Sequence, residues 1–269
     1  MADILRLTVL GCGSSPGVPR IIGDWGGCDP GNPRNRRTRM AAMIERVAKG
    51  GGTTRVVIDT GPDFRAQMLM ADVRRIDAVV YTHPHADHIH GIDDLRGYWL
   101  EQRNLIDIHA DVPTLTRLKQ AFGYCFETPP GGSYPPIVRA HTIDPPVTFV
   151  VEGEGGPLTL EPLPQIHGDI VSLGFKVGRM AYCPDVSDFP AATAERLHGL
   201  DVLVIDALQY KTHPSHFSLG EALAWIERLK PGLAVLTHMH TPLDYATVAA
   251  ETPDGVEPAY DGMILEIPF

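Results

Sequence analysis

The stretch Thr82-His83-Pro84-His85-Ala86-Asp87-His88 decides how the rest of this sequence is interpreted. It places three imidazoles and a carboxylate within six positions. The apolar residues 76–81 before it predict a buried strand, and residues 89–102 after it are typical of a helix. A strand that ends just before such a cluster presents these side chains together at the edge of its sheet.

The spacing within the cluster indicates two neighbouring metal positions. Because alternate residues of an extended segment point the same way, His83 and His85 can hold one ion. Asp87 and His88 lie where the helix begins and turn towards a second position. Imidazole and carboxylate donors suit zinc, manganese or iron. The alternative is a His-rich polar loop without a ligand, which mutual repulsion between protonated imidazoles disfavours.

The composition is that of an ordinary globular protein. The 269 residues are 43% hydrophobic and 21% charged, which predicts one large domain over residues 1–269. No apolar run approaches the ~20 residues of a membrane span. The N-terminus has no secretory pattern and the four cysteines form no close pair, so we expect a cytoplasmic protein. A net charge of -10 disfavours an extended nucleic-acid surface, although metal ions could still neutralise a small phosphate substrate.

The pattern His83-x-His85-x-Asp87-His88 after a strand resembles the signature of the metallo-β-lactamase superfamily. The resemblance implies an α/β fold, a four-layer αβ/βα sandwich with a binuclear metal site on one edge. It also implies three further ligands downstream, namely a lone His, a lone Asp and another His. His167, Asp185 and His238 occur in that order, each after a segment that reads as a strand.

The resemblance assigns these side chains to two divalent ions per chain, zinc or manganese. One ion is held by His83, His85 and His167, and the other by Asp87, His88 and His238, with Asp185 bridging the two. Asp59, at the end of a strand before the cluster, is expected to secure the backbone beneath it.

Three further stretches resemble one branch of the superfamily. They are the small-residue opening loop at 10–19, Asp-Asp-Leu-Arg at 93–96, and Ser-His-Phe-Ser at 215–218. The branch contains phosphoribosyl cyclic phosphate phosphodiesterases (PhnP-like) and ribonuclease Z. Some members carry a structural zinc on several cysteines after the opening loop. Here Cys28 stands alone, so we expect no such zinc.

The branch implies a metal-dependent phosphodiesterase, a hydrolase of a small cyclic or nucleotide-like phosphodiester. Asp87 would orient the nucleophile and His216 would be the general acid, with His213 as the alternative. Two other readings stay open. One is hydrolysis of a lactone, a thioester or an RNA phosphodiester. The other is a non-catalytic carrier resembling the pyrroloquinoline quinone biosynthesis protein.

Two segments leave their role open. The basic run at 35–39 is expected to be solvated or locally paired, rather than to bind phosphate. The Pro- and Gly-rich residues 127–146 are expected to lack regular structure, and form either a lid over the site or an inert excursion or dimer contact. We expect a small-molecule substrate and neither a nucleic-acid nor a membrane partner. Whether the protein forms a homodimer is left open.

Overall fold

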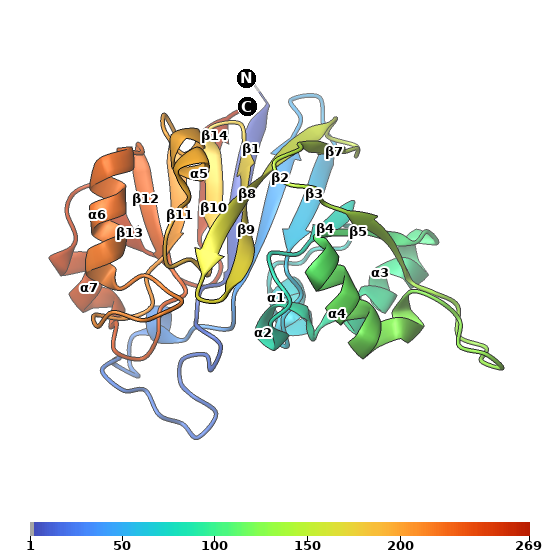
Figure 1. Cartoon of the computed structure of the whole chain (residues 1–269), viewed down its shortest axis with the longest axis horizontal. Coiled ribbons are helices and arrows are strands. Elements are labelled where there is room, and N and C mark those ends of the chain that lie inside the picture. Colours follow the sequence, from blue (N-terminus) through green and yellow to red (C-terminus); the bar gives the residue numbers. More distant parts are fainter. Residues whose placement is uncertain (1–2) are drawn as a thin grey trace.

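The computed structural model describes residues 3–269, which form two seven-stranded sheets (Figure 1). The first sheet contains β1 (Ile4–Gly11), β2 (Ala41–Val47), β3 (Thr53–Ile58), β4 (Ala78–Val80), β5 (Ile106–Ala110), β6 (Val138–Thr142) and β14 (Ile264–Pro268), in the order β14-β1-β2-β3-β4-β5-β6. The second contains β7 (Phe149–Val151), β8 (Leu158–His167), β9 (Ile170–Val177), β10 (Met180–Cys183), β11 (Val202–Asp206), β12 (Leu233–Thr237) and β13 (Val256–Pro258), in the order β13-β12-β11-β10-β9-β8-β7.

Helices cover the outer face of each sheet. The first sheet is flanked by α1 (Phe64–Met70), α2 (Ala86–Ile89), α3 (Leu95–Gln102) and α4 (Val112–Phe122), and the second by α5 (Ala191–Arg196), α6 (Leu219–Leu229) and α7 (Tyr245–Glu251) (Figure 1). The largest apolar core lies between the sheets, where Leu7 and Val56 of one cluster with Leu160 and Phe175 of the other. A second core packs helices onto the first sheet. The predicted four-layer sandwich is therefore confirmed. No helix in residues 3–269 is both long and apolar enough to cross a membrane.

Parallel strands bring the polar side chains to one edge. In the first sheet β3 and β4 run parallel, and in the second β10, β11 and β12 do. Because the carboxyl ends of parallel strands share an edge, the residues that follow these five strands meet there.

Two predicted elements are wrong. The sequence predicts one helix over residues 89–102, but α2 and α3 are separate. Gly91 lies so close to the preceding backbone that a Cβ on it would be 2.3 Å from the carbonyl oxygen of Gly61, and its N–H donates to Thr60 O at 2.7 Å. This packing places a break where helical periodicity alone indicates none.

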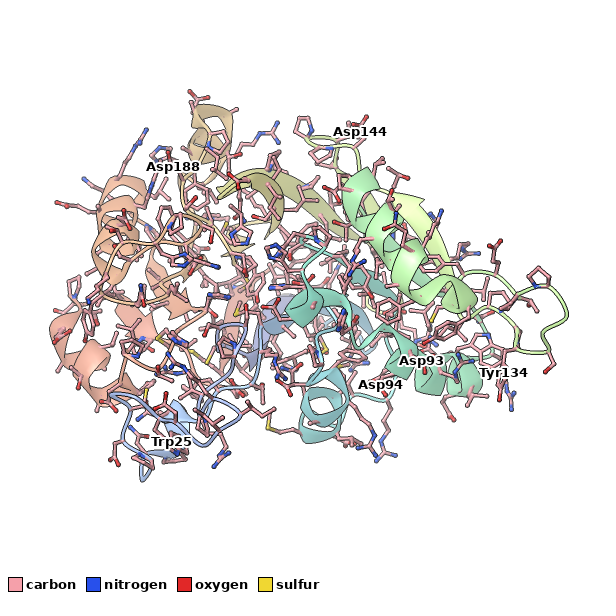
Figure 2. The ribbon with its side chains drawn as sticks, turned by 60° about the horizontal axis from the view of Figure 1, so that its bottom comes forward. Trp25, Asp93, Asp94, Tyr134, Asp144 and Asp188 are labelled. Carbon is pink, nitrogen blue, oxygen red and sulfur yellow. The ribbon has the colours of Figure 1, made fainter. Side chains whose placement is uncertain are left out.

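The second error concerns residues 127–146, which do contain regular structure. Residues 138–142 form β6, which pairs in parallel with β5. The remainder around Tyr134 projects sideways past α3 and α4, away from β8 and β10 (Figures 1 and 2). In this structure the segment therefore does not cover the strand ends.

A buried guanidinium joins residues 28–37 to the loop after β12. Arg37 is only 1% exposed, and its Nη2 donates to Leu243 O at 2.8 Å and Asn35 Oδ1 at 3.3 Å. Cys28 Sγ lies 3.4 Å from the same Leu243 oxygen and 3.9 Å from Arg37 Nη1. The lone cysteine thus packs beside Arg37, whose hydrogen bonds form a non-covalent cross-link between the two segments.

This cross-link predicts a stability effect. We expect Arg37→Met to lower the free energy of unfolding by about 1–3 kcal/mol, because it removes the buried guanidinium donors to Leu243 O and Asn35 Oδ1. Denaturant unfolding of the metal-loaded chain measures this. Arg36→Met, at the exposed neighbouring position, is the control and should stay within about 0.5 kcal/mol of the parent. Equal values for the two variants would contradict the assigned role.

Candidate metal centre

The His cluster forms a compact turn between β4 and α2. His85 occupies the N-cap of α2, so His83 and His85 precede the helix while Asp87 and His88 lie in it. The ring centroids of His83 and His88 are 4.1 Å apart, and those of His83 and His85 are 4.5 Å apart. His83 and His88 are fully buried. The three imidazoles of this turn therefore lie close together at the end of β4.

The second sheet supplies the other three side chains. His167 ends β8, while Asp185 and His238 follow β10 and β12. The Asp185 carboxylate is central, because its oxygens lie 3.3 Å from His238 Nε2, 3.4 Å from His88 Nε2, and 3.9 Å from Nε2 of both His83 and His167. One carboxylate thus faces imidazoles from both sheets.

The structure gathers the predicted donors into two groups of three. In each group the donor atoms lie within 4.8 Å of one another: His83, His85 and His167 in the first, and Asp87, His88 and His238 in the second. His83, His88 and Asp185 form another such group, which links the two. All seven predicted side chains are thus in place to hold two ions, and we propose that they do so.

The chemistry of the donors fits divalent cations. Three buried atoms at the centre, His88 Nε2, His238 Nε2 and Asp185 Oδ1, have no hydrogen-bond partner within residues 3–269. Burial lowers the pKa of His238 to about 3, so its ring is neutral, which is the form that binds metal. Burial acts the same way on His88, but the surrounding carboxylates, led by Asp185, outweigh it and raise the pKa of that ring. A site this rich in negative charge calls for cations.

Three residues at the strand ends adopt a left-handed backbone conformation. The φ angles are 65° for Asp59, 45° for Asp185 and 59° for His238. This region is unfavourable for residues other than glycine and costs of order 1–3 kcal/mol each. Three such residues at one edge of the sheets show that packing there holds the side chains in fixed directions.

Neighbouring groups set which ring nitrogen is free. Asp59 Oδ2 lies 2.7 Å from His88 Nδ1, and since a carboxylate only accepts, Nδ1–H donates and Nε2 is left for a ligand. Asp59 also accepts from the backbone N–H of Thr82 at 2.8 Å, which confirms the predicted tie beneath the cluster. In the same way His167 Nδ1 donates to Ser215 O at 2.7 Å.

His216 lies against this centre. Its ring stacks on His238 at a centroid distance of 4.3 Å and an angle of 12°, and meets His167 edge-on at 4.7 Å. His216 is 8% exposed, whereas His213, 5.3 Å away, is exposed. Ser218 and Glu221 form a capping box at the start of α6 immediately afterwards, which fixes the chain here. The geometry therefore favours His216 over His213.

Sequence reasoning missed Asp206. Its Oδ2 accepts from His216 Nδ1 at 2.7 Å and from the N–H of Val186 at 2.9 Å, and its Oδ1 lies 3.8 Å from His238 Nδ1. Burial disfavours protonation of His216, but the charge of Asp206 outweighs it and raises the pKa of the imidazole. The available signal was an acidic residue at the carboxyl end of a buried strand.

The opening loop borders the centre without adding a ligand. His240 is held by that loop, with Nδ1 2.8 Å from Ser14 Oγ and Nε2 2.6 Å from Arg20 Nη2. His240 is therefore occupied by these contacts, and it belongs to none of the groups of candidate metal ligands. His90 packs edge-on against Phe122, and Arg96 pairs with Asp93 at 2.8 Å, so both have structural contacts.

Two mixed sheets with outer helices, and imidazoles and carboxylates converging at one edge, define the metallo-β-lactamase class of fold. A family model described as a Beta-lactamase superfamily domain matches residues 54–239. The chain belongs to the metallo-β-lactamase superfamily, in the branch that contains the PhnP family and ribonuclease Z. Most members of this superfamily are hydrolases.

Three relatives illustrate the similarity. A crystal structure of a diphosphatase from the PhnP family has 35% sequence identity and a TM-score of 0.86, with 99% of this chain and 98% of that chain covered. Short-form human tRNase Z shares the fold at 18% identity and a TM-score of 0.66, with 98% and 100% covered. A protein of Porphyromonas gingivalis named octanoyltransferase is 33% identical over 264 residues, which are 96% of this chain and 51% of that protein. The chain spans about half the length of the curated relatives it matches.

The two groups of donors predict the metal content. We expect two divalent ions per chain in the metal-loaded protein, because each group offers three donors and Asp185 faces both. Elemental analysis after removal of metal with a chelator and reloading with zinc or manganese measures this. A content that stays at or below one ion per chain under excess metal would exclude the binuclear arrangement.

Proposed function

We propose that this protein is a binuclear metal-dependent phosphodiesterase acting on a small phosphodiester, cyclic or nucleotide-like. The observation that carries the proposal is His216, a buried histidine outside the two metal groups that Asp206 orients beside them. The 35% identity to a diphosphatase over nearly the whole length of both chains also supports it. Transfer to an oxygen leaving group needs such an acid, whereas release of a thiolate does not.

Each residue has a distinct task in this reaction. Bound divalent cations would supply positive charge to the phosphoryl oxygens and lower the pKa of water. The Asp87 side chain is 12% exposed, whereas those of His88 and His238 are at most 1% exposed, so its carboxylate can accept a hydrogen bond from the attacking water and orient it. Since Asp206 occupies Nδ1 of His216, that ring can meet the substrate only through Nε2, from which it donates a proton to the leaving oxygen. Before this transfer, the charge of Asp206 stabilises the ring of His216 in its protonated form.

A small substrate is favoured over a long one. The net charge of -10 would repel an extended polyanion away from the metal centre. The ions themselves neutralise only the phosphate groups that reach them. Because one relative is a diphosphatase, substrates with a P–O–P linkage belong to the proposed class.

The similarity to the octanoyltransferase favours a second candidate, hydrolysis of an acyl thioester. That name describes a protein about twice as long as the matched region, so it does not assign acyl transfer to this chain. Hydrolysis of a phosphodiester needs a proton from His216 for its oxygen leaving group, whereas hydrolysis of a thioester does not. The role of His216 therefore separates the two candidates.

A substrate panel tests the proposal. It contains bis(p-nitrophenyl) phosphate, a 2′,3′-cyclic nucleotide, a ribose 1,2-cyclic phosphate, ADP-ribose, a lactone and octanoyl-coenzyme A, each with zinc and with manganese. We expect the highest kcat/KM on one of the four phosphorus esters. If the lactone or the thioester is turned over faster than every phosphorus compound, the phosphodiesterase assignment is wrong.

A further inference from the structure

The peptide bond that follows Asp185 is held on both of its sides. Its carbonyl oxygen, Asp185 O, accepts from Ser172 Oγ at 2.7 Å, and its N–H, on Val186, donates to Asp206 Oδ2 at 2.9 Å. Ser172 and Asp206 are both fully buried. Because Asp185 has a φ of 45°, which is unfavourable for a residue other than glycine, these two bonds stabilise a strained conformation. The clamped peptide therefore fixes the direction in which the Asp185 carboxylate points.

A glutamine on the neighbouring strand extends this contact. Gln165 of β8 and Ser172 of β9 are paired directly across the two adjacent strands (Figure 1). Gln165 Nε2 donates to Ser172 Oγ at 3.1 Å and to Pro184 O at 2.8 Å. Since the Ser172 oxygen accepts from Gln165, its own proton is directed to Asp185 O. The carbonyl groups immediately before and after the Cα atom of Asp185 are thus both held by this pair of side chains.

Close packing confines the amide of Gln165. A Cβ on Gly174 would lie 2.6 Å from Gln165 Oε1 and 3.1 Å from Cys183 Sγ, so the amide lies against the backbone of β9 where no side chain intervenes. Gln165 is fully buried, and the candidate ligand His167 lies two positions further along the same strand. Strand β8 therefore supplies one ligand directly and, through Gln165 and Ser172, orients the carboxylate that faces both groups of ligands.

We propose that Ser172 and Gln165 are positioning residues of the metal centre. They act through Asp185, because the peptide groups that they hold on both sides of it keep its carboxylate directed at the imidazoles of both sheets. Neither side chain contacts an ion itself. The inference rests on the two-ion site proposed above, but not on which kind of bond is hydrolysed there.

Ser172→Ala tests the proposal, because it removes the donor to Asp185 O and very little volume. We expect the affinity for each of the two ions to fall by about tenfold or more, as is typical when a residue hydrogen-bonded to a metal ligand is mutated. Titration of the metal-free protein with zinc, in competition with a chelator, measures both affinities. The absorption spectrum of the cobalt-loaded variant should also differ from that of the parent, because it reports the arrangement of the ligands. Gln165→Met, which removes the donors to Pro184 O and Ser172 Oγ, should have the same effects.

Thr193→Val is the matched control. Thr193 Oγ1 donates to Pro164 O of β8 at 2.7 Å and the residue is 3% exposed, so this variant also removes a buried hydroxyl bonded to a backbone carbonyl. Denaturant unfolding of the metal-free proteins should show a comparable loss of stability in Ser172→Ala and Thr193→Val. Only Ser172→Ala and Gln165→Met should bind metal more weakly than the parent.

The possible failures are distinguishable. If the parent binds two ions and both Ser172→Ala and Gln165→Met bind them with the parent's affinities, the positioning role is wrong. It is also wrong if Thr193→Val weakens metal binding as much as Ser172→Ala, because the loss would then reflect stability alone. If the parent binds fewer than two ions, the two-ion site is wrong and this inference fails with it.

Discussion

Asp185→Asn is expected to abolish hydrolysis and to weaken both metal ions at once. The Asp185 carboxylate lies 3.3–3.9 Å from imidazole nitrogens of both metal groups, and its Oδ1 has no partner within residues 3–269. Asparagine keeps the shape of the side chain and tolerates the φ of 45°, so the change removes charge with little strain. The affinity for each ion should fall by more than the roughly 10- to 100-fold that is typical when a residue hydrogen-bonded to a metal ligand is mutated.

Metal titration by calorimetry together with elemental analysis measures the effect. Asp188→Asn, three residues along and exposed, is the matched control and should retain two ions. If Asp185→Asn loses one ion and binds the other with normal affinity, Asp185 is a ligand of a single ion and not a bridge.

His216→Ala is expected to have the second-largest effect. It should lower kcat by ~10²–10⁴-fold on a substrate with a poor alkoxide leaving group and by much less on bis(p-nitrophenyl) phosphate, whose leaving group needs little protonation. Metal content should stay at two, which checks that His216 is not a ligand, since it lies within 4.8 Å of His167 and Asp185 donor atoms.

Two companion variants define the role of His216. His213→Ala should leave kcat nearly unchanged, because that ring is exposed and its pKa is lowered by burial and by His216. Asp206→Asn should reproduce part of the loss with the same dependence on leaving group, because it acts by positioning His216. An equal loss of kcat on both substrates in His216→Ala would instead indicate stabilisation of the phosphoryl oxygens.

How much the sequence predicted depended on how local each feature is. His83, His85, Asp87 and His88 lie within six positions, so their spacing alone indicates their geometry. His167, Asp185 and His238 carry no local motif, and only the order implied by the superfamily singled them out. Asp206 has neither a local motif nor a place in that order. Its role arises from the parallel pairing of β10, β11 and β12, which cannot be read from the order of residues along the chain.

The misjudged elements have the same origin. The break between α2 and α3 depends on the contact of Gly91 with a backbone thirty residues earlier. Strand β6 is stabilised by its neighbour β5, and the surrounding prolines and glycines hid it. In both cases a distant contact overrode the local propensity.

The division of the seven metal-binding candidates between the two sheets has a consequence for assembly. The turn after β4 belongs to one half of the molecule, while His167, Asp185 and His238 belong to the other, 79 or more residues beyond His88. Neither half alone contains a complete set for both ions, so full occupancy requires that the halves have docked. Because ions bind the docked state in preference to the separated one, they stabilise the docked state. This stabilisation increases with the concentration of free metal. Removal of metal should therefore lower the free energy of unfolding of the whole domain, because the largest apolar core joins the same two sheets.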